Sequence, residues 1–423
     1  MKFQLASPSN YFTNLALPWS LHLTQWPEQH FVDVAHGIHR NVVKFTSHGD
    51  KVYAMKELRQ NVAEHEYEML KELEERGLPV VEVVGLITER DIEVPPREYI
   101  DDYVDMNERA LLITQYLDGS LPYRVIIERG IHIDQLEMML DALAELLVRL
   151  HISGFYWGDC SLSNALFKRD AGHMAAFLVD AETGEFFDFL SIGRREYDLD
   201  LAHTNIAGDL MDLQAAGVLP INLDPVDLAD SLVDRYNNLW NELTRDEVFS
   251  PAEQYKVESR IRRLNDLGFD IEEMEISTLD SGEKVRMQVK VVEPWHHRRR
   301  LQNLTGLSVQ ENQARRLLTD LDQYKARLSQ DFGREVPEAV AAFRWLTEVY
   351  QKALEAIPQD LKGGLEDAEL FHELLEHRWF TSEYAGKDIG LDEAIRSYIE
   401  NVLKQRKQGG EFSPDQDAFY RSR

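Results

Sequence analysis

The segment Asp159-Cys-Ser-Leu-Ser-Asn164 places a carboxylate and an amide five residues apart in a polar stretch. Two short apolar runs follow on either side of the turn-like Arg169–His173, which predicts a β-hairpin that leads to Asp180. Because a hairpin brings its end back to its start, we expect the side chains of Asp159, Asn164 and Asp180 to lie close together at the open end of the hairpin. Asn164 and Asp180 offer the oxygen ligands that Mg²⁺ prefers, and this ion commonly bridges phosphates. Asp159 is then left to orient or deprotonate an attacking hydroxyl.

A second pair of charges, Lys56 and Glu66, is expected to point into the interior. Lys56 ends the alternating strand Lys51–Lys56 and faces inward with the strand's apolar residues. Glu66 lies on the apolar stripe of the helix that follows, although Glu64 and Glu68 are alternative partners for the lysine. A buried ammonium–carboxylate pair is costly unless another group uses the charge. A phosphate held by the ammonium would be such a use.

The first half of the chain changes from a strand period to a helix period. Its first 110 residues are expected to form mostly strands around one helix, with Asn61 as the expected N-cap of that helix and Gly77 near its end. The strands are expected at residues 41–45, 51–56, 79–87 and 110–116. From Asp134 to Gly154 the apolar residues recur at helical spacing. A strand-rich part followed by a helix-rich part predicts an α+β fold.

Charge and cysteine content exclude several classes of protein. The 423 residues carry a net charge of −29, and so acidic a surface argues against wrapping nucleic acid or docking on anionic lipid. The single cysteine, Cys160, excludes an intramolecular disulfide and a cysteine-rich metal site. No apolar run approaches the roughly 20 residues of a membrane span, and the N-terminus lacks a signal pattern. We therefore expect a cytoplasmic globular protein.

A neutral region within this acidic chain indicates a separate C-terminal module. Residues 251–350 carry nearly equal numbers of basic and acidic side chains. The module is expected to contain a β-hairpin near residues 270–292 and then mainly helices, the first opened by a capping box at Ser308. Its basic cluster consists of Arg298, Arg299 and Arg300. Pairing of these arginines with the acidic first half is favoured over binding of nucleic acid, which is an unlikely partner.

In type, order and spacing, the chemical residues resemble those of the protein-kinase-like phosphotransferases. That superfamily uses a strand lysine, a helix glutamate, a catalytic-loop aspartate, an asparagine five residues later and a metal-binding aspartate after a hairpin. The matching positions are Lys56, Glu66, Asp159, Asn164 and Asp180. The whole chain also resembles a bacterial lipopolysaccharide-kinase-like family of unknown function.

The resemblance implies a two-lobed protein-kinase-like fold. The expected β-rich N-lobe covers residues 1–116, and the helical C-lobe with the catalytic loop covers residues 117–220. Residues 221–407 would form the mostly helical module with its β-hairpin, and residues 408–423 a flexible tail.

The resemblance also implies where ATP binds. The nucleotide is expected beside Gln115, Tyr116 and Leu117. A loop with a single glycine, Gly37, would cover its phosphates, which Lys56 would hold.

Two further acidic positions have open roles. Either Asp198 or Asp200 is expected to anchor the backbone of the catalytic loop, as an acidic residue does in kinase helices. Glu182, two residues after Asp180, is either a further metal ligand or a surface charge.

Together these features predict an ATP- and Mg²⁺-dependent, kinase-like phosphotransferase that acts on an unidentified hydroxyl acceptor. A sugar or another small molecule is favoured slightly over a protein, and transfer of AMP instead of phosphate stays open. The alternative is a regulatory, nucleotide-binding pseudokinase that signals through its C-terminal module. The single-glycine loop favours this alternative, whereas the intact Asp159, Asn164 and Asp180 favour catalysis.

Overall fold

The computed structural model describes most of the chain and divides it into two compact units. The described residues are 1–6, 17–34, 41–49, 51–90, 92, 109–128, 133–244, 247–249, 269–279, 284–294 and 296–408. The first unit comprises Met1–Lys168 and Ala175–Asn241, and the second comprises Arg169–Met174 and Glu242–Arg423. Gly37 and residues 409–423 of the predicted tail lie outside the described residues, whereas Gln408, the first residue of that tail, is the last residue of a helix.

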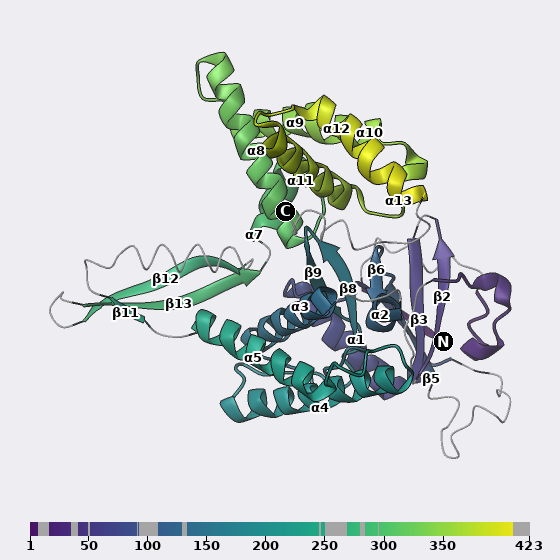
Figure 1. The fold of residues 1–423 in the computed structure, drawn as a ribbon. Coiled ribbons are helices and arrows are strands. Elements are labelled where there is room, and N and C mark those ends of the chain that lie inside the picture. Colours follow the sequence, from purple (N-terminus) through teal and green to yellow (C-terminus); the bar gives the residue numbers. More distant parts are fainter. Residues whose placement is uncertain are drawn as a thin grey trace. The chain divides into compact units, whose positions relative to one another are not determined.

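An antiparallel five-stranded sheet opens the first unit (Figure 1). In the order β1-β4-β5-β3-β2, its strands are β1 (Lys2–Leu5), β4 (Val83–Thr88), β5 (Arg109–Gln115), β3 (Lys51–Arg59) and β2 (Val42–His48). The four strands expected from the sequence are confirmed. Lys56 on β3 stands opposite Val43 of β2 and Leu112 of β5, so strands flank it on both sides.

Helix α1 (Gln60–Glu75) follows β3 directly and packs against β3, β4 and β5. Glu66 is fully buried on the same face as the helix's buried apolar residues, as its place on the apolar stripe predicted. The N-cap expected at Asn61 is wrong. Because β3 continues to Arg59, the helix starts at once, and Asn61 is an exposed residue of its first turn.

The chain from residue 120 to residue 244 is mainly helical. Its elements are β6 (Ser120–Pro122), α2 (Tyr123–Glu128), α3 (Ile133–Ile152), β7 (Phe155–Tyr156), β8 (Ala165–Asp170), β9 (His173–Leu178), β10 (Glu185–Phe186), α4 (Ile192–Ala215) and α5 (Pro225–Thr244). Helix α3 confirms the helix expected from Asp134, and neighbouring strands β8 and β9 confirm the predicted hairpin. Helices α4 and α5 run side by side, and a hydrogen bond of 2.8 Å joins the imidazole of His203 to the carboxylate of Asp230 (Figure 1). The sheet followed by these helices confirms the α+β fold.

The second unit contains a three-stranded sheet and a helical core. Strands β11 (Glu247–Phe249), β13 (Lys284–Pro294) and β12 (Phe269–Leu279) pair in that order, which confirms the hairpin expected near residues 270–292. The helices are α7 (His296–Thr305), α8 (Glu311–Phe332), α9 (Glu338–Trp345), α10 (Lys352–Ala356), α11 (Asp367–Ala385), α12 (Leu391–Tyr398) and α13 (Lys404–Gln408), with π-helical turns at Leu346–Gln351 and Ile399–Leu403. In the described part of the chain, no helix is both long enough and apolar enough to cross a membrane.

The capping box expected at Ser308 is wrong. Helix α8 starts at Glu311, and the backbone N–H of Gln310 just before it donates to the side-chain oxygen of Gln313 at 3.1 Å. Ser308 lies before this cap, in a segment without helical structure.

The favoured pairing of the arginine cluster is also wrong for Arg300. Its guanidinium lies 2.6 Å from the carboxylate of Glu338 and 3.3 Å from that of Asp322. Both partners belong to the second unit and not to the acidic first half of the chain.

Candidate active site

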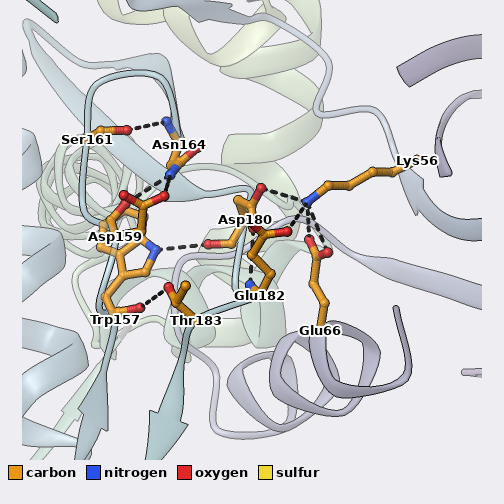
Figure 2. Close-up of polar contacts among 9 residues, drawn as sticks. All are labelled: Lys56, Glu66, Trp157, Asp159, Ser161, Asn164, Asp180, Glu182 and Thr183. Atoms are coloured by element: carbon orange, nitrogen blue, oxygen red, sulfur yellow. Dashed lines mark hydrogen bonds and ion pairs between the residues drawn. The ribbon is translucent and has the colours of Figure 1, made fainter. Parts of the chain in front are cut away.

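The ammonium of Lys56 joins three elements of the first unit (Figure 2). Its Nζ donates hydrogen bonds to both carboxylate oxygens of Glu66, at 2.9 and 3.0 Å, which confirms the contact expected between these residues. It also lies 2.6 Å from Oδ2 of Asp180, which follows β9. Strand β3, helix α1 and the end of the hairpin therefore place one ammonium between two carboxylates.

Burial and charge act against each other at this cluster. Burial lowers the pKa of Lys56, but the carboxylates of Glu66 and Asp180 outweigh it and raise this pKa. Burial raises the pKa of Glu66 to about 8 against the opposing effect of Lys56, and the charges of Asp180 and Glu182 add to the rise. Glu182 itself lies 3.9 Å from the Lys56 ammonium. The carboxylates of Glu66, Asp180 and Glu182 thus all lie within 4 Å of the single ammonium of Lys56.

The same carboxylates could hold a divalent cation. One oxygen from each of Glu66, Asp180 and Glu182 lies within 4.8 Å of the other two. Such hard oxygen donors fit Mg²⁺, and they suit it better than zinc or copper. Glu182, whose role the sequence left open, therefore lies among the candidate ligand atoms.

The catalytic-loop carboxylate of Asp159 is held at both oxygens. The side-chain amide of Asn164 donates to Oδ2 of Asp159 at 3.1 Å and to its backbone carbonyl at 2.9 Å. Asn205, on α4, donates to Oδ1 at 3.0 Å. The sequence did not reveal this contact of Asn205 with the candidate site, because nothing in the pattern of α4 marks the residue.

Asp198 anchors the backbone of this loop, which decides between the two acidic candidates. Its fully buried carboxylate accepts hydrogen bonds from the backbone N–H groups of Trp157, at 2.7 Å, and Gly158, at 2.8 Å. Gly158 has φ of 77°, a conformation that a residue with a side chain rarely adopts. Asp200, by contrast, is exposed.

The loop is also fixed to the segment that carries Asp180. The indole N–H of buried Trp157 donates to the backbone carbonyl of Asp180 at 2.9 Å, and the hydroxyl of Thr183 donates to the carbonyl of Trp157 at 2.8 Å (Figure 2). At the base of the hairpin, the backbone N–H of Val179 donates to the carbonyl of Asn164 at 3.1 Å. These contacts fix the position of the loop that carries Asp159 relative to the segment that carries Asp180.

A cavity of about 460 Å³ brings most of the expected site residues together. Its lining residues include Lys56, Asp159, Asn164, Asp180 and Glu182. The expected clustering of Asp159, Asn164 and Asp180 is therefore confirmed.

The nucleotide segment does not share this cavity. Gln115, Tyr116 and Leu117 are not among its lining residues. The backbone N–H groups of Gln115 and Tyr116 already donate to the carbonyls of Glu82 and Val52. Contact between this segment and ATP stays a prediction.

Replacement of Glu66 by alanine should weaken ATP turnover at least tenfold. The change leaves the Lys56 ammonium with Asp180 as its close partner and frees it to move. Glu64→Ala and Glu68→Ala are matched controls, because both side chains are exposed on the same helix. Steady-state kinetics of the three variants tests the assignment, and equal turnover in all three would contradict it.

Comparison with protein families bears on this geometry. Residues 39–202 match the family model described as Lipopolysaccharide kinase (Kdo/WaaP) family. This span contains Lys56, Glu66, Asp159, Asn164 and Asp180, so the resemblance to a lipopolysaccharide-kinase-like family is confirmed for the part of the chain that carries the site. Residues 238–403 match a second family model, Domain of unknown function (DUF4032).

Two of the solved structures that match this chain do so at low sequence identity. One is described as WaaP in complex with acyl carrier protein, with 15% identity and a TM-score of 0.33 over 57% of this chain and 100% of that one. The other is an aminoglycoside-3′-phosphotransferase of type VIII, with 15% identity and a TM-score of 0.30 over 50% of this chain and 86% of that one. At these TM-scores the similarities do not bear on function. The comparison with curated proteins gave no match.

Proposed function

We propose that this protein is an ATP- and Mg²⁺-dependent phosphotransferase that modifies a hydroxyl group of a small molecule. The observation that supports it best is one cavity lined by Lys56, Asp159, Asn164 and Asp180, with the Lys56 ammonium bound to Glu66 and Asp180. Phosphoryl transfer needs little covalent participation by the protein, so positioning and charge supply most of the catalysis. The cluster offers both.

Each side chain has a role that follows from its contacts. By the resemblance to kinase-like proteins, Lys56 would hold the α- and β-phosphates. Its hydrogen bonds to Glu66 fix the direction of its ammonium. Asn164, Asp180 and Glu182 would hold Mg²⁺, which when bound neutralises charge on the phosphate oxygens. Because Asn164 and Asn205 hold its oxygens, the Asp159 carboxylate is oriented to accept the proton of the acceptor hydroxyl.

The wall of the cavity beside Asp159 suits a small polar acceptor. Besides the site residues already named, the cavity is lined by Gly208 and by polar or charged side chains, namely Asn41, Tyr123, Arg124, Ser161, Ser163, Thr204, Asn205, Asp209 and Asp212. Asp209 accepts hydrogen bonds from the hydroxyl of Ser163 at 3.1 Å and from its backbone N–H at 3.3 Å. Such groups can bind several hydroxyls of one molecule, which favours a sugar over an apolar acceptor.

Removal of metal ions or of the Lys56 ammonium should weaken ATP binding at least tenfold. Calorimetric titration with ATP, in Mg²⁺ and then in excess EDTA, measures the first effect, and Lys56→Ala in Mg²⁺ measures the second. Lys44→Ala is the control, because Lys44 is exposed on the neighbouring strand and does not line the cavity. Binding that is unchanged by both EDTA and Lys56→Ala would contradict the proposed function.

A further inference from the structure

The turn of the β8–β9 hairpin belongs to the second unit, which includes Arg169–Met174. Asp170 in this turn is 2% exposed. Its carboxylate accepts hydrogen bonds from the backbone N–H groups of Gln313, at 2.7 Å, and Asn312, at 3.1 Å, and from the side-chain amide of Asn312 at 3.1 Å. The first amides of a helix have no partner within it, and a helix N-terminus favours negative charge. Asp170 therefore caps α8 from a distant part of the chain.

A second carboxylate, Glu369 of α11, holds the next residue of the turn. Its Oε2 accepts hydrogen bonds from the backbone N–H of Ala171 at 3.1 Å and from the side-chain amide of Gln313 at 2.9 Å. Ala171 has φ of 51°, a left-handed conformation that a residue with a side chain rarely adopts. These contacts, all within the second unit, impose a specific shape on the turn.

The hairpin connects two of the proposed metal ligands. Strand β8 starts immediately after Asn164, and β9 ends two residues before Asp180. The backbone hydrogen bond between Val179 and Asn164 ties the two ends together. A one-residue change of register between β8 and β9 would move Asn164 relative to Asp180, so the shape of the turn bears on the distance between these two ligands.

We propose that helices α8 and α11 set the geometry of the metal site through this hairpin. Asp170 is then a positioning residue for Asn164 and Asp180, and the C-terminal residues are part of what makes the site competent. The inference rests on the proposed function, because it deepens the role of the same site. It predicts that the loss of the Asp170 cap weakens the response to Mg²⁺ more than a comparable loss elsewhere in the second unit.

The experiment compares carboxylates of the second unit in the 423-residue chain. Binding of a non-hydrolysable ATP analogue is followed at increasing Mg²⁺, and thermal unfolding is measured in parallel. Asp170→Ala should raise the Mg²⁺ concentration for half-maximal binding at least fivefold, whereas Asp170→Asn, which keeps an acceptor oxygen, should raise it less. Asp320→Asn is the control, because Asp320 accepts a hydrogen bond from the indole of Trp345 at 2.7 Å in the same unit and has no contact with the turn. It should lower thermal stability and leave the Mg²⁺ requirement unchanged.

The outcomes separate a positioning role from a purely structural one. An unchanged Mg²⁺ requirement in Asp170→Ala, or an equal rise in Asp320→Asn, would overturn the inference while the proposed function stands. If Asp170→Ala does not fold, the variants Asp170→Asn and Glu369→Gln test the inference in its place. Wild-type Mg²⁺ dependence in both of these variants would overturn the inference. A wild-type protein that fails to bind the analogue with Mg²⁺ contradicts the proposed function and the inference together.

Discussion

Asp180→Asn should lower Mg²⁺-dependent ATP turnover by about 100-fold or more and leave the fold intact. The change keeps the size of the side chain and removes the charge that lies 2.6 Å from the Lys56 ammonium and among the candidate metal ligands. Lys56 keeps its contact with Glu66, so the packing of α1 on the sheet should persist. Steady-state turnover at saturating Mg²⁺ measures the effect.

Asp200→Asn is the matched control for this variant. Asp200 is exposed on α4, makes no side-chain contact with the catalytic loop and does not line the cavity. Circular dichroism and thermal unfolding should give similar curves for both variants. Wild-type turnover in Asp180→Asn at saturating Mg²⁺ would disprove the assignment of Asp180.

Asp159→Ala should abolish transfer, with a loss of about 100- to 10,000-fold, the range that general bases contribute. Binding of Mg²⁺ and ATP should stay within about threefold of the wild type, because Asn164 and Asp180 remain. The change leaves the amides of Asn164 and Asn205 without their carboxylate partner. Turnover and calorimetric binding, measured on the same preparation, separate the two effects.

The same variant separates an enzyme from a regulatory pseudokinase. A regulatory protein needs nucleotide binding but no proton acceptor, so its biological output should survive the loss of Asp159. An enzyme should lose that output. Full complementation of a deletion strain by Asp159→Ala would therefore count against catalysis, and Asp200→Ala serves as the control.

Local periodicity was sufficient to predict the Lys56–Glu66 pair. The alternation of β3 and the apolar stripe of α1 each place one charge inside, and two buried opposite charges stabilise the fold only if they meet. The hairpin between Asn164 and Asp180 was predictable for a similar reason, because short apolar runs around a turn favour pairing of neighbouring strands.

The remaining parts of the site depend on contacts between distant segments. The sequence pattern did not distinguish Asp198 from Asp200 as the anchor of the loop. The packing of α4 decides between them, because it buries Asp198 and leaves Asp200 exposed. Asn205 and Asp170 act on partners 46 and 142 residues away, and no local pattern marks either one. The prediction of an N-cap at Asn61 was wrong because β3 continues directly into α1, so that no loop precedes the helix at that residue.

Identification of the products made from ATP tests the central claim most directly. ATP labelled in either the α- or the γ-phosphate is incubated with the protein, Mg²⁺ and a panel of sugars and other small polyols, and with the Asp159→Ala variant in parallel. The account predicts that the wild type forms ADP and a γ-labelled phosphomonoester of an acceptor, and that the variant forms neither. Release of pyrophosphate with transfer of the α-label, or ADP formation no faster than in Asp159→Ala, would contradict it.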